Sequence, residues 1–388
     1  MEEKQILESK AIKDFMSQYT AKQTIRQYKI AVKKYFMYID KNPDRYLKDL
    51  RFIDNGKKLK AIDEYEKNIS AYRNSLIADE YSPKCTHNYV STIKLLLEHN
   101  HCDLDVSFWK KLKERGADKV VEPICDFKIP TTTELRTILA HATAQSRAMF
   151  LLQATSGLRI GEVVSLKRGD IDLDYDCPHI IIRGKTSKTR MKGRTRCSQE
   201  AKQAIIDWLN VRAKAIETIN KRTPPEYQKS TTMNKDDYIF PVTTKSARKM
   251  WNRLLERAGF TGEDTSGKYA RHLMSTHTLR KFFRNELSKY DNGLAQYLMN
   301  QRTGLDKRYR DYTDEYLDQE YAKGVRYLIL NENYSGDVEK INESLKEKDE
   351  MIEKMQKQIL ELNTKINTIN IDTIAELLKE NILANKKP

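Results

Sequence analysis

Residues 116–130 interrupt the helical periodicity of the chain, and this break constrains its fold more than any other feature. The segment holds two prolines and lacks a hydrophobic period. Apolar residues recur at helical spacing before it, and Thr131 with Glu134 forms the pattern of a capping box after it. A chain of 388 residues is long enough for two or three domains. We therefore expect a helical domain over residues 1–115, a linker, and a second domain over 131–335.

The first domain contains three helical runs. One begins near Thr24, has one apolar face, and ends at Asn42-Pro43. A second covers residues 62–78, and a third starts at Ser82-Pro83, with serine as the N-cap and proline in the first turn. The second domain adds more helices and one β-rich segment near residues 171–198. The fold class that follows is mainly α with a small β-sheet.

The last segment, residues 336–388, has a heptad pattern. Apolar side chains alternate at spacings of three and four residues, with one interruption at Lys348. This seam predicts a coiled-coil helix, and the alternative is a single amphipathic helix packed on its own chain. The seam consists of Val338, Ile341, Leu345, Lys348, Ile352, Met355, Ile359, Leu362, Ile366 and Ile369.

Charge is distributed unevenly between this tail and the rest of the chain. From Asp337 onward, 9 Lys stand against 11 Asp and Glu, a net of −2, so the body carries 61 basic against 44 acidic residues, a net of +17. A basic body indicates a polyanionic partner such as nucleic acid, although a solvated basic surface has the same composition. The apolar stretches are too short to cross a membrane, and no apolar signal segment opens the chain. Five widely spaced cysteines indicate reduced thiols, a cytoplasmic protein, and neither metal nor cofactor.

Two short motifs and one tyrosine carry the chemistry. Gly157-Leu158-Arg159-Ile160-Gly161-Glu162 lies between two apolar helical runs, His277-Thr278-Leu279-Arg280 follows about 120 residues later, and Tyr309 lies beyond. In this order they resemble the Gly-Leu-Arg-x-x-Glu and His-x-x-Arg boxes of the tyrosine recombinase (phage-integrase-type) family. The resemblance covers roughly residues 10–330. It implies a helical core-binding domain followed by a mixed α/β catalytic domain.

The family chemistry needs a phosphate clamp, an acid–base group and a nucleophile. Two guanidiniums can stabilise the extra negative charge of a phosphodiester in its transition state without a metal, and the resemblance gives that role to Arg159 and Arg280. Glu162, three residues after Arg159, can orient its guanidinium. Tyr309 would attack the phosphorus, and His277 would serve in acid–base catalysis.

A basic segment follows Ile180-Ile181-Ile182 and predicts a β-hairpin that presents cations to a phosphate backbone. In the family, a hairpin lysine protonates the leaving 5′-oxygen. Lys185 best matches that position, and Lys188 is the alternative. The expected DNA contacts alternate along the segment, so that in a strand they would share one face: Lys188, Arg190, Lys192, Arg194 and Arg196.

The chain departs from the family pattern before the tyrosine. Where the family has a histidine or tryptophan, this chain has Gln301, with Arg302 beside it, and glutamine donates a hydrogen bond but carries no proton. Tyr312 and Tyr316 compete with Tyr309 as the nucleophile. The spacing of Tyr309 to Leu317, Tyr321 and Leu328 resembles that of archaeal and archaeal-virus integrases.

We expect a site-specific DNA recombinase, an integrase that acts on double-stranded attachment sites during integration or excision of a virus or mobile element. The resemblance implies a tetramer on two duplexes, cleavage through a 3′-phosphotyrosine, and no requirement for ATP or metal. One alternative is a type IB-like topoisomerase, which shares the chemistry but acts as a monomer. Another is a DNA-binding protein that has lost catalysis, as Gln301 would allow.

Overall fold

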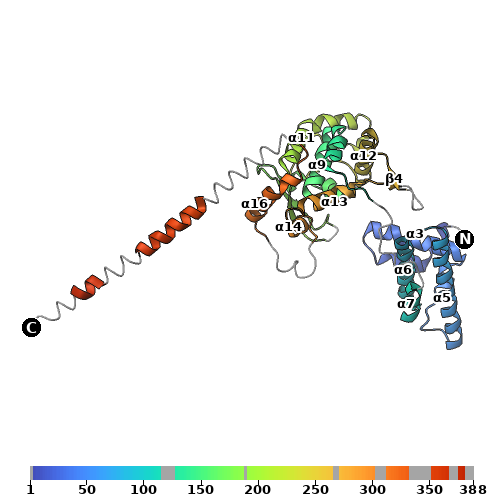
Figure 1. Ribbon diagram of the computed structural model, residues 1–388. Helices are drawn as coiled ribbons and strands as arrows, with labels where there is room; N and C mark the ends of the chain where they lie inside the picture. Colours follow the sequence, from blue (N-terminus) through green and yellow to red (C-terminus); the bar gives the residue numbers. More distant parts are fainter. Residues whose placement is uncertain are drawn as a thin grey trace, which may run out of the picture. The chain divides into compact units, whose positions relative to one another are not determined.

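The computed structural model describes residues 3–114, 127–187, 190–264, 271–301, 312–331, 351–366 and 375–380 (Figure 1). The chain divides into two compact units. The first is Met1–Asp126 together with Gly262–Leu273, and the second is Phe127–Thr261 together with Met274–Pro388. The short segment Gly262–Leu273 therefore groups with the first unit, although it lies within the second in sequence. Most of the expected linker lies outside the described residues.

The first unit is helical. Its core is formed by side chains such as Phe36, Ile69 and Leu96, which are fully buried. The hydroxyls of Tyr35 and Tyr46 lie 2.9 Å apart within this core. The helices are α1 (Glu3–Glu8), α2 (Lys10–Ser17), α3 (Lys22–Ile39), α4 (Pro43–Tyr46), α5 (Asn55–Ala78), α6 (Pro83–His99) and α7 (Val106–Glu114), and the strands β4 (Glu263–Asp264) and β5 (Arg271–His272) pair antiparallel.

The expected helix start at Ser82 is confirmed in detail. The Ser82 hydroxyl accepts a hydrogen bond from the backbone N–H of Cys85 at 3.2 Å, and Pro83 occupies the first turn. The preceding helix α5 begins at Asn55, seven residues before the expected run, and its apolar spacing is weak there because Lys57, Lys58 and Lys60 dominate the first turns.

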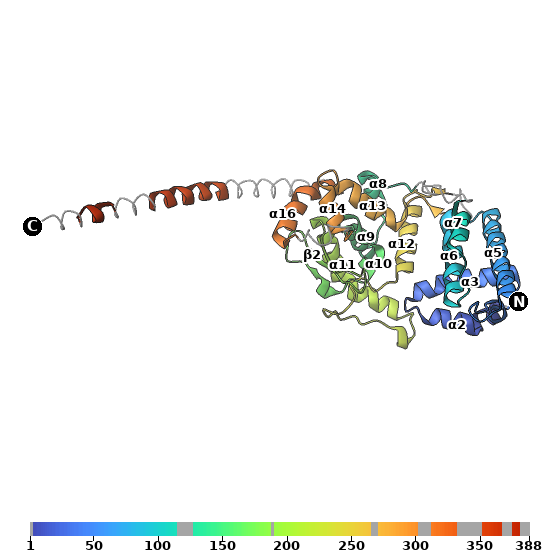
Figure 2. The same ribbon diagram turned by 90° about the horizontal axis from the view of Figure 1, so that it is seen from below.

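The second unit is built around α9 (Ala144–Ser156), whose side chains are almost all buried from Ala148 to Ser156. The helices α11 (Gln199–Asn220) and α13 (Thr276–Leu287) pack against it (Figure 2). The predicted capping box opens α8 (Thr132–Ala140), where the Thr131 hydroxyl and the Glu134 carboxylate each accept from the other's backbone N–H. The remaining elements are α10 (Ile160–Val164), α12 (Thr244–Arg257), α14 (Asn292–Leu298), α16 (Asp314–Gly324) and the 3₁₀ helices η2 (Arg168–Asp170), η3 (Pro225–Tyr227) and η4 (Val325–Tyr327).

A small antiparallel sheet lies in the predicted β-rich segment. Its order is β1 (Ile171–Asp172), β2 (His179–Ile182) and β3 (Gly193–Arg196), and Ile181 pairs with Arg194. Ile180 and Ile182 are buried, whereas Ile181 on the opposite face is half exposed. The expected fold class, mainly helical with one small sheet, is confirmed.

In the tail, residues 351–366 and 375–380 are helical. The five seam residues in the first of these stretches are 52–58% exposed. They are Ile352, Met355, Ile359, Leu362 and Ile366. The other five seam positions lie outside the described residues, and the coiled coil stays a prediction. Among the helices that the structure describes, none is long and apolar enough to cross a membrane.

Candidate active site

A tight turn after α9 places Arg159. Gly157 ends the helix with a φ of +68°, the left-handed region, and a Cβ there would lie 2.4 Å from a ring carbon of Phe283. The close packing of α13 against this turn therefore requires glycine. Arg159 follows as the N-cap of α10, with 23% of its side chain exposed.

Glu162 holds Arg159 through both oxygens. Its Oε2 accepts the backbone N–H of Arg159 at 2.8 Å, and its Oε1 accepts Nη1 of the guanidinium at 2.9 Å. The carboxylate is only 3% exposed, so water competes little for these bonds. The expected contact between Glu162 and Arg159 is thus present, and the same carboxylate caps α10.

Arg280 approaches the same carboxylate from α13. Its side chain is 1% exposed, its Nη1 donates to the carbonyl of Gly157, and its Nη2 donates to the carbonyl of Met299 at 2.7 Å. Nη1 also lies 3.9 Å from Oε2 of Glu162. The Nε of Arg280 is buried without a hydrogen-bond partner in the described part of the chain.

The two guanidiniums share one carboxylate and keep an excess positive charge. Burial, followed by the nearby Arg159, lowers the pKa of Arg280 to about 10, so the group is still protonated at neutral pH. An approaching phosphate would relieve this repulsion and raise the pKa again. This pair, called the arginine clamp below, can therefore bind a phosphodiester and stabilise its transition state.

His277 lies in the first turn of α13, three residues before Arg280. Ser275 caps this helix, and its hydroxyl accepts the backbone N–H of His277 at 3.3 Å. The imidazole is exposed, whereas Arg280 is buried. The His-x-x-Arg spacing thus sets one exposed and one buried side chain on the same helix, and the acid–base role of His277 stays a prediction.

Lys185 projects from the connection between β2 and β3, which is called the lysine loop below (residues 183–192). Its side chain is exposed, as are those of Arg190 and Lys192. Gly184 is required here because a Cβ would lie 2.9 Å from the carbonyl oxygen of Arg190. Lys188, the alternative general acid, lies outside the described residues.

Arg194 and Arg196 depart from the expected DNA-binding face. Arg196 is fully buried, and its guanidinium binds Asp318 at 2.5 Å and Asp314 at 2.8 Å, both on α16. Arg194 binds the other oxygen of Asp314 at 2.9 Å and the carbonyl of Tyr312 at 2.8 Å. Both cations are therefore used inside the fold, because alternation along β3 points them at an acidic helix that sequence spacing does not bring near.

The structure describes only some of the residues around the candidate nucleophile. Tyr309 and Arg302 lie outside the described residues. Gln301 is half buried after α14, and its backbone N–H donates to the carbonyl of Gln296 at 3.0 Å. The alternative tyrosines, Tyr312 and Tyr316, stack with their ring centroids 4.7 Å apart.

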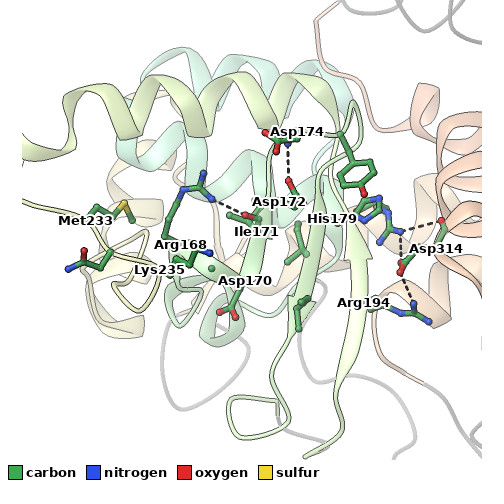
Figure 3. Close-up of a pocket in the computed structure, with 16 residues that line it drawn as sticks. Arg168, Asp170, Ile171, Asp172, Asp174, His179, Arg194, Met233, Lys235 and Asp314 are labelled. Atoms are coloured by element: carbon green, nitrogen blue, oxygen red, sulfur yellow. Dashed lines mark hydrogen bonds and ion pairs between the residues drawn. The ribbon is translucent and has the colours of Figure 1, made fainter.

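A cavity of about 650 Å³ lies beside the sheet (Figure 3). Both acidic and basic side chains line it, among them Asp172, His179, Arg194 and Asp314. His179 stacks on Tyr175 at 3.7 Å and lies 2.9 Å from Asp318. These charges compensate one another, and the cavity includes none of the arginine clamp. Across the described ranges, no three His, Cys, Asp or Glu side chains gather closely enough to hold a metal ion.

Three residues that shape this region were not predicted from the sequence. Asp314 and Asp318 neutralise two predicted DNA-binding arginines; Asp314 lies with Glu315 in the acidic first turn of α16, and Asp318 lies beyond that turn. Asn300 is buried with a φ of +53° and contacts the lysine loop. Its position next to Gln301, where the family pattern breaks, is the one signal that points to it.

Residues 130–289 match the model of the phage integrase family. No curated protein matches. Among solved structures, the chain is similar to a lambda integrase(75–356) dimer bound to a COC′ core site, with 16% identity over 78% of this chain and 95% of that one and a TM-score of 0.49.

It is also similar to a lambda integrase tetramer bound to a Holliday junction, with 15% identity over 78% of this chain and 79% of that one and a TM-score of 0.49. XerH recombinase in a post-cleavage complex with difH substrate gives 16% identity over 83% of this chain and 88% of that one and a TM-score of 0.47. These likenesses are distant, with identities of 15–16% and TM-scores below 0.5.

Proposed function

We propose that the protein, whose residues 130–289 match the phage integrase family model, is a site-specific DNA recombinase that cleaves and rejoins DNA through a 3′-phosphotyrosine. The observation that carries this proposal is the arginine clamp. Arg159 and Arg280 come from motifs about 120 residues apart, yet both reach the buried carboxylate of Glu162. One carboxylate cannot neutralise two guanidiniums, so the site retains charge for a phosphate.

In the proposed reaction, the arginine clamp holds the scissile phosphodiester. It stabilises the extra negative charge that the phosphate carries in the transition state. The hydroxyl of Tyr309 attacks phosphorus, and its proton passes to a base, for which His277 is the candidate. The bond from phosphorus to the 5′-oxygen breaks as the tyrosyl bond forms. Lys185 gives a proton to the leaving 5′-oxygen, and attack by a 5′-hydroxyl of the partner duplex reverses these steps.

The proposed partner is double-stranded DNA. Arg190 and Lys192 are exposed on the lysine loop, and we retain them as phosphate contacts together with Lys188. In the first unit, Lys22, Arg26 and Lys29 are exposed on α3 at spacings of four and three residues, which place them on one helix face. Arg194 and Arg196 are left out because Asp314 and Asp318 already bind them.

We further propose that four protomers assemble on two duplexes, as the family resemblance implies, and that the tail contributes a coiled coil. The exposed seam from Ile352 to Ile366 supports the second point, since one chain leaves these side chains in water. Sedimentation of the full chain and of a version ending at Ser335, without DNA, tests it. If both are monomers over a wide concentration range, self-association through the tail is excluded.

Covalent capture tests the catalytic proposal. The protein is incubated with nicked, end-labelled duplexes with a randomised core, and DNA retained after denaturation is sequenced. A recombinase yields an adduct on a defined sequence, and that sequence becomes the substrate for variants. A type IB-like enzyme would instead relax supercoiled plasmid as a monomer, and a catalytically impaired protein would bind DNA without any adduct.

A further inference from the structure

Asn300 lies between two parts of the candidate active site. The carbonyl of Met299, just before it, accepts Nη2 of Arg280 at 2.7 Å, and Gln301 follows it. Its own φ is +53°, a left-handed conformation that favours glycine and is tolerated by asparagine. The backbone therefore explains the choice of Gly or Asn here, but not the presence of a side chain that is 2% exposed.

The amide of Asn300 contacts the lysine loop where the loop returns to the sheet. Its Nδ2 donates to the carbonyl of Met191 at 3.1 Å. Gly193 makes room for it, because a Cβ at Gly193 would lie 2.9 Å from Cγ and 3.0 Å from Nδ2 of Asn300. Gly193 in β3 and Asn300, which follows α14, are thus closely packed against each other.

This contact leaves one polar atom of the amide unsatisfied. The Oδ1 of Asn300 is buried without a hydrogen-bond partner in the part of the chain that the structure describes. A buried unsatisfied acceptor costs about 1–3 kcal/mol. Glycine would suit the backbone and avoid that cost, but it would lose the hydrogen bond to the lysine loop, so the amide is explained by what it holds.

The lysine loop is fastened at both of its ends. On the outgoing side, Nε of Arg183 binds Oδ1 of the buried Asp170 at 2.7 Å. A turn follows, in which the N–H groups of Thr186 and Ser187 donate to the carbonyl of Arg183. On the returning side, the fastening is Asn300. Lys185 is exposed between these two points, so the loop backbone determines where its ammonium can reach.

We propose that Asn300 is a positioning residue that fixes the lysine loop to the Arg280 end of the site and so sets the distance from Lys185 to the leaving 5′-oxygen. This inference rests on the proposed function, in which the ammonium proton of Lys185 passes to the 5′-oxygen as the bond from phosphorus breaks. The same short segment, Met299–Gln301, then supports both the arginine clamp and the general acid.

The test compares two leaving groups in the Asn300→Gly variant, in which glycine can adopt the same positive φ and the side chain with its amide is removed. The substrates are the attachment site selected by covalent capture and the same DNA with a 5′-bridging sulfur, which leaves without protonation. We expect Asn300→Gly to slow adduct formation about tenfold on oxygen and less than about twofold on sulfur, since general acids contribute roughly 10²–10⁴-fold. Equal losses on both substrates would overturn the inference.

Two further variants sharpen the comparison. Gly193→Ala pushes a methyl group into the amide of Asn300, and we expect the same selective loss on oxygen. Combined with Asn300→Gly it should add little, because both changes break one contact. Asn220→Ala is the matched control: its Nδ2 donates to the carbonyl of Lys229 at 2.7 Å, far along the chain from the lysine loop, and its oxygen-to-sulfur ratio should stay at the wild-type value.

Hydrogen exchange of the full chain without DNA separates this inference from the proposed function. Asn300→Gly should speed exchange of the Thr186, Ser187 and Arg190 amides, whose hydrogen bonds close the loop. Unchanged exchange there would overturn the inference even for an active recombinase. If the wild-type protein forms no adduct on any DNA, the recombinase proposal is rejected, and with it the catalytic purpose of this contact. Faster exchange in Asn300→Gly would then still show that Asn300 holds the lysine loop in place.

Discussion

The second unit contains two arginine pairs that were both expected to contact phosphate and that differ in charge balance. Arg159 and Arg280 share one carboxylate, Glu162, whereas Arg194 and Arg196 face two, Asp314 and Asp318. The first pair keeps a net positive charge, and the second is neutral. Both include a buried arginine, so burial does not separate them. The number of carboxylates within reach indicates which cations remain available to a phosphate.

The largest expected effect lies outside both pairs, at the nucleophile. Tyr309→Phe should abolish the covalent adduct and leave DNA binding nearly unchanged, because the hydroxyl forms the bond to phosphorus and the ring does not. Denaturing gels with labelled DNA measure the adduct, and filter binding measures affinity. An adduct that persists in Tyr309→Phe and vanishes in Tyr312→Phe would move the nucleophile to Tyr312.

Changes to the arginine clamp should reduce the rate without abolishing binding. We expect Arg280→Lys to slow adduct formation about 10²–10³-fold, the effect of removing one donor to a developing oxyanion, because lysine cannot reach both carbonyls and the phosphate together. The carbonyls of Gly157 and Met299 would also lose their donors. A single-turnover rate at saturating protein isolates this step, and a rate within a few fold of wild type would remove Arg280 from the clamp.

Substitutions in the neutral pair, Arg194 and Arg196, should lower the free energy of unfolding. Arg196→Met should lower the free energy of unfolding by about 2–4 kcal/mol, since the carboxylates of Asp314 and Asp318 lose a buried partner. Arg194→Met, at a half-buried site with one carboxylate, is the control and should cost less. Urea unfolding measures both. If Arg196→Met instead weakened DNA binding at unchanged stability, the division between the two pairs would be wrong.

How well the sequence predicts a contact depends on how far apart the two residues lie along the chain. Capping at Ser82 and Thr131 depends on residues three apart, and both predictions were confirmed. The carboxylate of Glu162 was predicted from the same spacing. The partners of Arg196 lie 118 and 122 residues away, on a helix whose approach no local pattern encodes. Asn300 and Met191 are likewise 109 residues apart, so only the three-dimensional structure reveals their contact.

The smallest expected effect is a pH dependence at Asp314. Burial raises the pKa of this carboxyl, but Arg196 and Arg194 outweigh burial and lower it below its ordinary value. Because the pKa of this carboxyl is lower in the folded than in the unfolded protein, its charged form stabilises the fold. This stabilisation is complete at pH values above the unfolded pKa of about 3.9, and it is lost as the pH falls through the folded pKa. Asp314→Asn should therefore cost stability at neutral pH and progressively less as the pH falls below about 4.

The side chain of Asp314 is 41% exposed, so solvent screening limits the neutral-pH loss to about 1 kcal/mol or less. Urea unfolding of wild type and Asp314→Asn at a series of pH values measures the difference, with Asp236→Asn, a fully exposed partner of Lys167, as the control for a surface carboxyl. A difference that stayed constant down to pH values well below 4 would mean that Asp314 acts through its hydrogen-bond geometry. The contacts of Arg194 and Arg196 with the carboxylates would then depend on geometry more than on charge. The number of nearby carboxylates would no longer distinguish this pair from the arginine clamp.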